Sequence, residues 1–343
     1  MRAFRFEKWQ QGASFQDVPM PEPGPGEVLI RIGGAGACHS DLHLMHEWTL
    51  ESFPQLATSP LPFTLGHENA GWVEAGDLRG YEPGTPVVVS PTWTCGRCQA
   101  CREGATNYCD QKVTLTGGLG RDGGMAEYMV APVTSLVPLG DLEPWQAAPL
   151  SDAGLTSYHA VKRCLPNLVP GTTAVVIGVG GLGHLGVAYL RQLSGARIIA
   201  VDREASALEM AREFGADLCL PSDDTTAELI REATDGLGAN AILDFVGTDA
   251  TLAMAAETVR KRAQIVVVGL GGGVLPFQFG ALPHGCSIVT TMAGSTAELG
   301  EIVALARAGR VMPRVQRFAL EDATSVFEQL KANEISGRAV MVP

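Results

Sequence analysis

The chain has 343 residues, which is enough for about two domains that each bury their own core. Apolar residues make up 46% and charged residues only 18%, and 41 glycines indicate a globular chain with many tight turns. The formal net charge of −12 offers no overall positive field to a phosphate backbone or an anionic membrane surface. Nucleic acid is therefore not an expected partner.

The longest stretch without Asp, Glu, Lys or Arg runs from residue 263 to 297, which is long enough to cross a bilayer. It contains glycines, prolines and His284, so alternating strands and turns explain it better than a membrane helix. The sequence begins with MRAFRFE and shows no apolar export signal. We therefore expect a cytoplasmic protein that does not bind membranes.

The pattern of apolar residues changes near Gly171. Before it, short strands alternate with turns, which predicts an irregular, strand-rich domain. After it, apolar runs alternate with helical segments, as in βαβ units. The predicted strands are 173–178, 197–202, 216–220, 241–247, 264–270 and 287–291, and the predicted helices are 182–193, 205–215, 225–234 and 249–261. This α/β pattern predicts a doubly wound parallel sheet, and a later helix and final strand are expected to return to the first domain.

The segment 178–183 has the sequence GVGGLG, follows a predicted strand and opens a predicted helix, as a dinucleotide-binding fingerprint requires. The first glycine permits a tight turn, the second lets the backbone approach a pyrophosphate, and the third lets the helix pack closely on the strand. The predicted cofactor-binding loop comprises Gly178, Gly180, Gly181, Leu182 and Gly183.

An acidic residue, Asp202, ends the next predicted strand. Its carboxylate would accept hydrogen bonds from ribose hydroxyls and repel a 2′-phosphate, which favours NAD over NADP. Arg203 follows directly and weakens that preference.

Four of the eight cysteines crowd into 15 residues, with two Cys-x2-Cys spacings. Four thiolates suit tetrahedral Zn²⁺ and leave no open position for a substrate, so the site would be structural. An iron–sulfur cluster is the alternative for the same ligands. The predicted ligands are Cys95, Cys98, Cys101 and Cys109.

Three further segments, GACHSDLH, LGHENAG and SDAGLT, precede the glycine-rich loop. Together with the cysteine cluster and GVGGLG, their order resembles the zinc-dependent alcohol dehydrogenases of the medium-chain dehydrogenase/reductase superfamily, most closely the bacterial and archaeal tetrameric secondary-alcohol dehydrogenases. The resemblance covers essentially the whole chain. It implies a GroES-like catalytic domain over 1–153, with a zinc lobe at about 93–112 and completed by 292–343, a Rossmann NAD-binding domain over 154–291, and a homotetramer.

The resemblance also implies roles for individual residues. Cys38, His67 and Asp152 would hold a catalytic zinc, and many relatives have cysteine at the third of these positions. Glu68 resembles an acid that approaches the metal during ligand exchange. Ser40 and His43 match a hydroxyl-to-histidine proton relay. Further predicted cofactor contacts are Arg338, Gly269, His39 and Thr156, and the predicted substrate pocket comprises Trp93, Trp48, Leu119 and Met292.

These expectations together predict a zinc-dependent alcohol dehydrogenase that carries two Zn²⁺ per chain and transfers hydride between NAD and a primary or secondary alcohol. Met292 stands where some relatives have an aromatic residue, which suggests a wider pocket for bulky or aryl ketones. A zinc dehydrogenase of the formaldehyde or polyol type is one alternative. A zinc-free reductase on the same scaffold and a non-catalytic NAD- and zinc-binding protein are others, and a count of bound zinc separates them.

Overall fold

The computed structural model describes residues 1–49, 61–111 and 116–343. Contacts between Cα atoms divide the chain into two compact units. Unit 1 comprises residues 1–155 together with 293–343, and unit 2 comprises residues 156–292. Unit 2 is therefore inserted into the sequence of unit 1.

Unit 1 is built on a seven-stranded sheet with the order β10-β6-β5-β3-β18-β17, and β9 also pairs with β3. Its centre is the antiparallel pair of β3 (Glu27–Gly36) and β5 (Glu68–Gly76), in which Gly36 lies opposite Glu68. A Cβ atom at position 36 would lie 1.9 Å from Glu68 Oε2, so only glycine fits beside that carboxylate. The other strands of unit 1 are β1 (Arg2–Phe6), β2 (Ala13–Asp17), β4 (Phe63–Thr64), β6 (Pro86–Val89), β7 (Thr116–Gly117), β8 (Gly120–Arg121), β9 (Tyr128–Pro132), β10 (Leu136–Pro138), β17 (Val315–Ala319) and β18 (Arg338–Val342).

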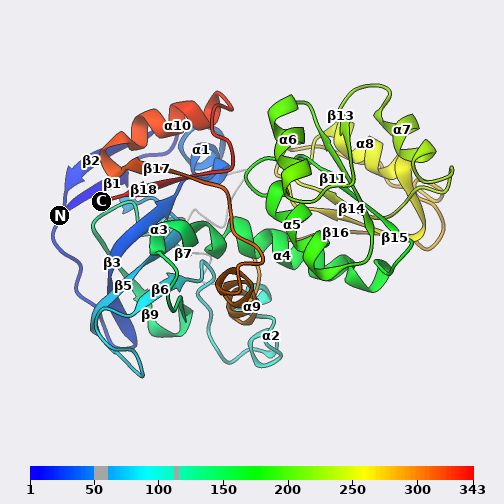
Figure 1. Ribbon diagram of the computed structural model, residues 1–343. Helices are drawn as coiled ribbons and strands as arrows, with labels where there is room; N and C mark the ends of the chain where they lie inside the picture. Colours follow the sequence, from blue (N-terminus) through cyan, green and yellow to red (C-terminus); the bar gives the residue numbers. More distant parts are fainter. Residues whose placement is uncertain (50–60, 112–115) are drawn as a thin grey trace. The chain divides into compact units, whose positions relative to one another are not determined.

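The helices of unit 1 are short, apart from two in its C-terminal segment (Figure 1). Among the described residues of unit 1, helices of more than two turns occur only in that segment, and α9 begins with a capping box between Ser295 and Glu298. The helices are α1 (His39–Leu42), α2 (Gln99–Arg102), α3 (Pro144–Ala147), α9 (Thr296–Arg307) and α10 (Ala323–Lys331), with a π-helical turn at His43–Glu47.

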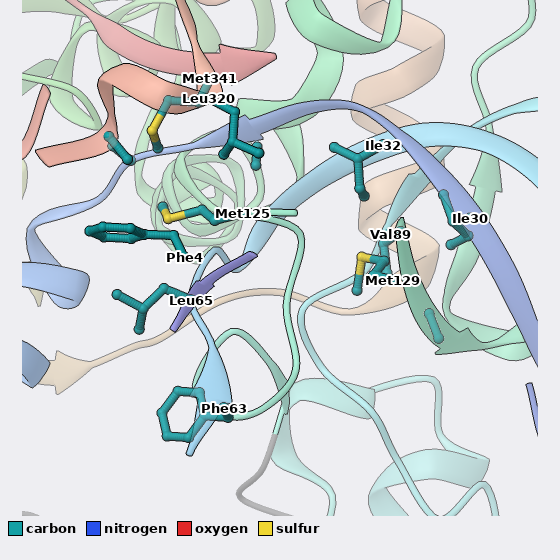
Figure 2. Close-up of a cluster of buried hydrophobic side chains, with 14 of the residues drawn as sticks. Phe4, Ile30, Ile32, Phe63, Leu65, Val89, Met125, Met129, Leu320 and Met341 are labelled. Carbon is teal, nitrogen blue, oxygen red and sulfur yellow. The ribbon is translucent and has the colours of Figure 1, made fainter. Parts of the chain in front are cut away.

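Both chain segments of unit 1 contribute to one hydrophobic core (Figure 2). Phe4 and Met125 come from the first segment, whereas Leu320 and Met341 come from the second, and each is at most 2% exposed. Complete burial of a side chain of this size stabilises the fold by about 1.5–3 kcal/mol. The C-terminal segment is therefore an integral part of unit 1.

Unit 2 contains a six-stranded parallel sheet with the order β13-β12-β11-β14-β15-β16. The direction of strand addition reverses between β11 and β14, which is the switch point where doubly wound sheets bind dinucleotides. Figure 1 shows the central strands of this sheet with α5, α6 and α8 around them. The strands are β11 (Thr173–Ile177), β12 (Arg197–Asp202), β13 (Leu218–Pro221), β14 (Ala239–Asp244), β15 (Val259–Val267) and β16 (Ser287–Thr290), and the helices are α4 (Ala153–Cys164), α5 (Gly183–Leu193), α6 (Ala205–Glu213), α7 (Thr226–Glu232) and α8 (Asp249–Thr258). The first three residues of α4 belong to unit 1.

All six strands predicted for the parallel sheet are present, and the α/β fold class is confirmed. Most boundaries differ from the predictions by a few residues, and the difference at the end of α8 has a clear cause. The helix expected over 249–261 ends at Thr258, and β15 starts at Val259, which pairs with Ala239 of β14. A β-branched side chain is readily accommodated in a strand, so this pairing shortens the helix.

The long uncharged stretch predicted to form strands and turns comprises the end of β15, the loop that joins it to β16, β16 itself, the residues that follow β16 and the start of α9. Among the described residues, no helix is both long enough and apolar enough to cross a membrane.

Candidate metal centres and dinucleotide loop

Three metal-binding side chains from separate parts of unit 1 meet beside the central strand pair. Cys38 follows β3, His67 precedes β5, and Asp152 precedes α4. Their ligand atoms lie within 4.8 Å of one another. Asp152 Oδ2 is 3.6 Å from Cys38 Sγ and 3.5 Å from His67 Nε2. The fold therefore brings together the three residues predicted to hold a catalytic zinc.

Strand register explains part of this convergence. Because Gly36 pairs with Glu68, the end of β3 and the start of β5 lie side by side, and the residues just beyond them become neighbours. Cys38 is also the N-cap of α1, where its N–H donates to Asp41 Oδ2 at 3.0 Å. This hydrogen bond fixes the turn that presents the Cys38 thiol.

A buried carboxylate orients the imidazole of His67. The distance from His67 Nδ1 to Asp41 Oδ1 is 3.2 Å, and both side chains are almost fully buried. A carboxylate accepts the Nδ1 proton, so the lone pair of Nε2 faces Asp152 and is free for a metal. This is the arrangement in which a histidine binds zinc.

The pKa values of the cluster show that it favours a positive charge. Burial lowers the pKa of His67, but the charge of Asp41 and hydrogen bonds with Asp152 and Asp41 outweigh burial and raise it well above its ordinary value. Burial raises the pKa of Asp152, but the hydrogen bond and charge of His67 bring it down to about 2. One sulfur, one nitrogen and one oxygen donor are typical zinc ligands, and the charges of thiolate and carboxylate balance Zn²⁺. The residues therefore fit a zinc site with an open fourth position.

A buried ion pair lies next to these ligands. Arg338 Nη2 is 2.7 Å from Glu68 Oε1, with the side chains 2% and 0% exposed, and the N–H of Ala153 also donates to Glu68 Oε1. Burial raises the pKa of Glu68 to about 7, even though Arg338 opposes the shift. Burial lowers the pKa of Arg338, but the carboxylate of Glu68 outweighs it and raises the pKa. The structure thus places Arg338 in the interior of unit 1, and its phosphate contact stays a prediction.

The predicted relay residues lie on the helical turns that follow Cys38. Ser40 is half-buried, with its Oγ 3.7 Å from Cys38 Sγ. His43 is also half-buried, its ring stacks on Trp48 with centroids 5.5 Å apart, and its Nδ1 contacts the Glu47 carboxylate. Residues three apart share a helix face, so Ser40 and His43 project in similar directions.

Four cysteines of unit 1 form a second cluster around α2. Cys95, Cys98, Cys101 and Cys109 are all free thiols, and their sulfur atoms lie within 4.8 Å of one another. The backbone N–H of Cys98 donates to Cys95 Sγ, and that of Cys95 donates to Cys109 Sγ. Hydrogen bonds of this kind stabilise the negative charge of metal-bound thiolates. The set fits a closed, structural zinc site.

Backbone N–H groups also shift the thiol pKa values within this cluster. Hydrogen bonds from the backbone N–H groups of Arg97 and Cys98 lower the pKa of Cys95 to about 6. The thiol of Cys101 has its pKa raised to about 11, first by burial and then by the neighbouring cysteines. Cys95 is therefore ready to bind as a thiolate at neutral pH. Residue 112, the expected end of the lobe, lies outside the described residues.

The glycine-rich loop of unit 2 joins β11 to α5. Gly178 has φ +82°, and a Cβ atom there would lie 2.5 Å from Val246 Cγ2. A Cβ atom on Gly183 would lie 1.8 Å from the Gly178 carbonyl oxygen, so glycine is required where the helix meets the strand. A Cβ atom on Gly180 would meet nothing within 4 Å. That open backbone is a place where a pyrophosphate fits.

Other predicted cofactor residues have defined positions. Asp202, at the end of β12, accepts hydrogen bonds from the N–H groups of Val179 at 2.6 Å and Glu204 at 2.9 Å. Leu182 is the N-cap of α5, and Gly181 precedes it. Arg203 and His39 are exposed, whereas Thr156 is buried on α4. Gly269 follows β15 and contacts the backbone of Val246. Their contacts with a cofactor stay predictions.

A small pocket lies beside His67. Trp93 lines it together with Asn69 and Ser90, and the Trp93 side chain is only 8% exposed. The other predicted substrate residues lie elsewhere: Trp48 and Leu119 pack against the core of unit 1, and Met292 of unit 2 is 61% exposed. Of the four, only Trp93 lines this pocket.

Comparisons with known proteins agree with this geometry. Residues 24–141 match the family model of the alcohol dehydrogenase GroES-like domain, and residues 181–308 match that of the zinc-binding dehydrogenases. An NAD-dependent alcohol dehydrogenase of Sulfurisphaera tokodaii is 36% identical, with 100% of both chains covered. The chain belongs to the zinc-dependent alcohol dehydrogenase family of the medium-chain dehydrogenase/reductase superfamily.

Two further relatives of this family member are informative. The crystal structure of the alcohol dehydrogenase from Aeropyrum pernix is 35% identical, with a TM-score of 0.92 and 100% of both chains covered. A D-arabinose 1-dehydrogenase (NADP⁺) of Saccharolobus solfataricus is 35% identical, covering 100% of this chain and 97% of its own. The family resemblance expected from the sequence is confirmed.

Two functional details of this zinc dehydrogenase were missed by the sequence analysis. Asp41, which orients His67, lies three residues after Cys38, and the capping-box pattern of that helix start was the signal that could have indicated it. The pairing of Glu68 with Arg338 had no local signal, because the two residues are far apart in the sequence.

Proposed function

We propose that this chain is an NAD-dependent, zinc-containing alcohol dehydrogenase that interconverts alcohols with aldehydes or ketones. The observation that carries the proposal is the convergence of Cys38, His67 and Asp152, a three-donor set with room for one more ligand. The second cluster, of four thiols, has no open position, so the two sites divide into one catalytic and one structural role.

Oxidation of an alcohol removes a proton from oxygen and a hydride from the adjacent carbon. Zn²⁺ held by Cys38, His67 and Asp152 would supply a Lewis acid that lowers the pKa of the alcohol. NAD⁺ at the loop of unit 2 would supply the hydride acceptor. Asp41 keeps the Nδ1 proton on His67, so that Nε2 remains available as a donor.

Ser40 and His43 would move the alcohol proton towards solvent. A hydroxyl can accept one proton while it releases another, and a histidine can exchange protons near neutral pH. Ser40 lies next to the Cys38 sulfur, and His43 lies one helical turn further along. Both side chains are partly exposed, as a path to water requires.

We further propose a preference for secondary alcohols and ketones, including bulky or aryl ones. The apolar Trp93 beside His67 favours uncharged substrates. The preference for bulky substrates rests on the sequence alone, because Met292 replaces an aromatic residue of some relatives. The same proposal places the enzyme in the cytoplasm as a homotetramer. The outer strand β16 and the exposed Phe277 and Phe279 support association through unit 2.

The decisive experiment supplies purified protein with NAD⁺ or NADP⁺ and a panel of primary, secondary and aryl alcohols. Reduced nicotinamide is followed by absorbance before and after a zinc chelator, and zinc per chain is measured. We expect two zinc ions per chain and chelator-sensitive reduction of NAD⁺. The matched variant Asp152→Asn should retain one zinc and lose turnover. Activity that survives complete removal of zinc would refute the proposal, and so would two bound zinc ions without turnover of any alcohol.

A second candidate is oxidation of a sugar or polyol. It is favoured by the relative named D-arabinose 1-dehydrogenase (NADP⁺), whose 35% identity is within the range of the alcohol dehydrogenases. Adding D-arabinose to the panel with both cofactors separates the two. Asp202 at the end of β12 supports NAD⁺ as the better cofactor in either case.

A further inference from the structure

Three side chains of unit 2 hold consecutive parts of the glycine-rich loop. Asp202 accepts the N–H of Val179, His184 Nδ1 lies 2.9 Å from the Gly180 carbonyl oxygen, and Ser157 Oγ donates to the Leu182 carbonyl at 2.9 Å. His184 was not among the residues predicted from the sequence. We propose that His184 is a positioning residue that aims the Gly181 N–H at the pyrophosphate of NAD, an inference that rests on the proposed function.

The geometry of the peptide bond carries the argument. The Gly180 carbonyl also accepts the backbone N–H of His184 at 3.3 Å, so it faces into the first turn of α5. A trans peptide is planar, and its N–H points opposite to its carbonyl. Fixing the Gly180 carbonyl therefore fixes the Gly181 N–H in the direction away from the helix. Within residues 1–49, 61–111 and 116–343, no group accepts a hydrogen bond from that N–H.

The loop needs such a restraint because of its glycines. Gly180 and Gly181 have no side chains to restrict their backbone, and the space around the Cβ position of Gly180 is open. A loop that is disordered before binding loses conformational entropy when a ligand orders it, which weakens binding. A hydrogen bond from His184 holds one peptide of the loop in the binding orientation beforehand.

The surroundings of His184 suit this role. The side chain is 0% exposed, and its ring contacts the edge of Phe214 at a centroid distance of 4.9 Å. A carbonyl oxygen can only accept a hydrogen bond, so Nδ1 must carry the proton. Two contributions of the ring can therefore be tested separately, the hydrogen bond to Gly180 and the packing against Phe214.

Two variants separate these contributions. His184→Asn keeps a donor close to the position of Nδ1 but loses the ring, whereas His184→Phe keeps the ring contact but loses the donor. His184→Leu is a second variant without the donor, in case the Phe variant does not fold. The dissociation constant for NADH is measured by fluorescence titration, and the melting temperature and zinc content of the cofactor-free protein are the controls.

We expect the Phe and Leu variants to bind NADH about 2- to 12-fold more weakly, the effect of one hydrogen bond. The Asn variant should stay within about 2-fold of the wild type. The KM for NAD⁺ should rise with the dissociation constant, while kcat at saturating NAD⁺ and the KM for alcohol stay unchanged.

The proposal is overturned if the wild type and the variants without the donor bind NADH equally well. It is also overturned if the Asn variant binds as weakly as the Phe variant, since packing would then be the cause. A wild-type protein that fails to bind NADH would refute the proposed function itself, so the two failures are distinguishable.

Discussion

The buried ion pair of Glu68 and Arg338 allows a quantitative test of how unit 1 is stabilised. Glu68→Gln would leave the guanidinium of Arg338 without its carboxylate in a position that is 2% exposed. Arg338→Met would leave the Glu68 carboxylate with only the N–H of Ala153 at the same oxygen. At pH 8, above the Glu68 pKa of about 7, both groups of the wild-type pair are charged.

The expected magnitude follows from burial. Breaking a buried pair by removing one partner costs about 3–5 kcal/mol, because the remaining charge is desolvated without compensation. The double variant Glu68→Gln/Arg338→Met leaves no unpaired charge, so its loss should be smaller than the sum of the single losses by at least about 1.5 kcal/mol.

The free energy of unfolding is measured by urea titration with tryptophan fluorescence. All five tryptophans lie in unit 1, so the signal reports the unit that contains the pair. Glu74→Gln is the matched control, because Glu74 and Arg31 are also 2.7 Å apart but are 37% and 44% exposed. That exposed pair should contribute no more than about 1 kcal/mol. Zinc content is measured in parallel, to show that the neighbouring ligands still bind metal.

Two results would refute this reasoning. If Glu68→Gln lowers the free energy of unfolding no more than Glu74→Gln does, the buried ion pair contributes no more to stability than the exposed one. If the losses of the single variants simply add in the double variant, Glu68 and Arg338 do not stabilise each other at all.

Three other predictions concern separate parts of the chain. Gly183→Ala places a Cβ atom 1.8 Å from the Gly178 carbonyl oxygen, so the melting temperature should fall and NADH should bind more weakly in a titration. An unchanged melting temperature and NADH affinity would contradict this close packing. Cys101→Ser should lower zinc by one ion per chain and reduce the melting temperature, and a protein that keeps two zinc ions would argue against the four-cysteine site. Burial raises the pKa of Asp217, but hydrogen bonds lower it more strongly, so it lies below its ordinary value. The Asp217 carboxylate therefore stabilises the fold above about pH 4, and this stabilisation is lost as the pH falls further. Because Asp217 is partly exposed, Asp217→Asn should lower the free energy of unfolding at pH 7 by less than about 1 kcal/mol, and by less still below pH 4. Asp224→Asn, at an exposed position, is the control and should match the wild type at both pH values.

Short-range sequence patterns predicted much of this structure. The inner strands β11 and β12 of unit 2 are apolar runs rich in β-branched residues and are buried over most of their length, and such runs are visible without knowledge of the fold. The four clustered cysteines and the glycine-rich loop are also local, so their chemistry follows from spacing. Cys38, His67 and Asp152 are not local, and they were found only because the order of their motifs resembles a known family.

Features that depend on tertiary contacts were not predictable in this way. The phosphate contact of Arg338 was expected only from the family resemblance and stays a prediction, whereas its pairing with Glu68 of a distant strand became visible only in the structure. His184 looked like one residue of an amphipathic helix, because no sequence pattern shows that its ring lies beside the Gly180 carbonyl. The start of β15 at Val259 likewise depends on its pairing with β14.

The insertion of unit 2 within unit 1 has a consequence for biosynthesis. During synthesis, all residues of unit 2 are present once residue 292 has been added. The strand β18, which pairs with β3 in unit 1, is present only after residues 338–342 have been added. All seven predicted zinc ligands precede that point, so the metals can bind while the core of unit 1 is still open. Stalled or truncated translation products that lack β18 would expose apolar surface beside β3, and these are the forms of the protein that chaperones and proteases would meet.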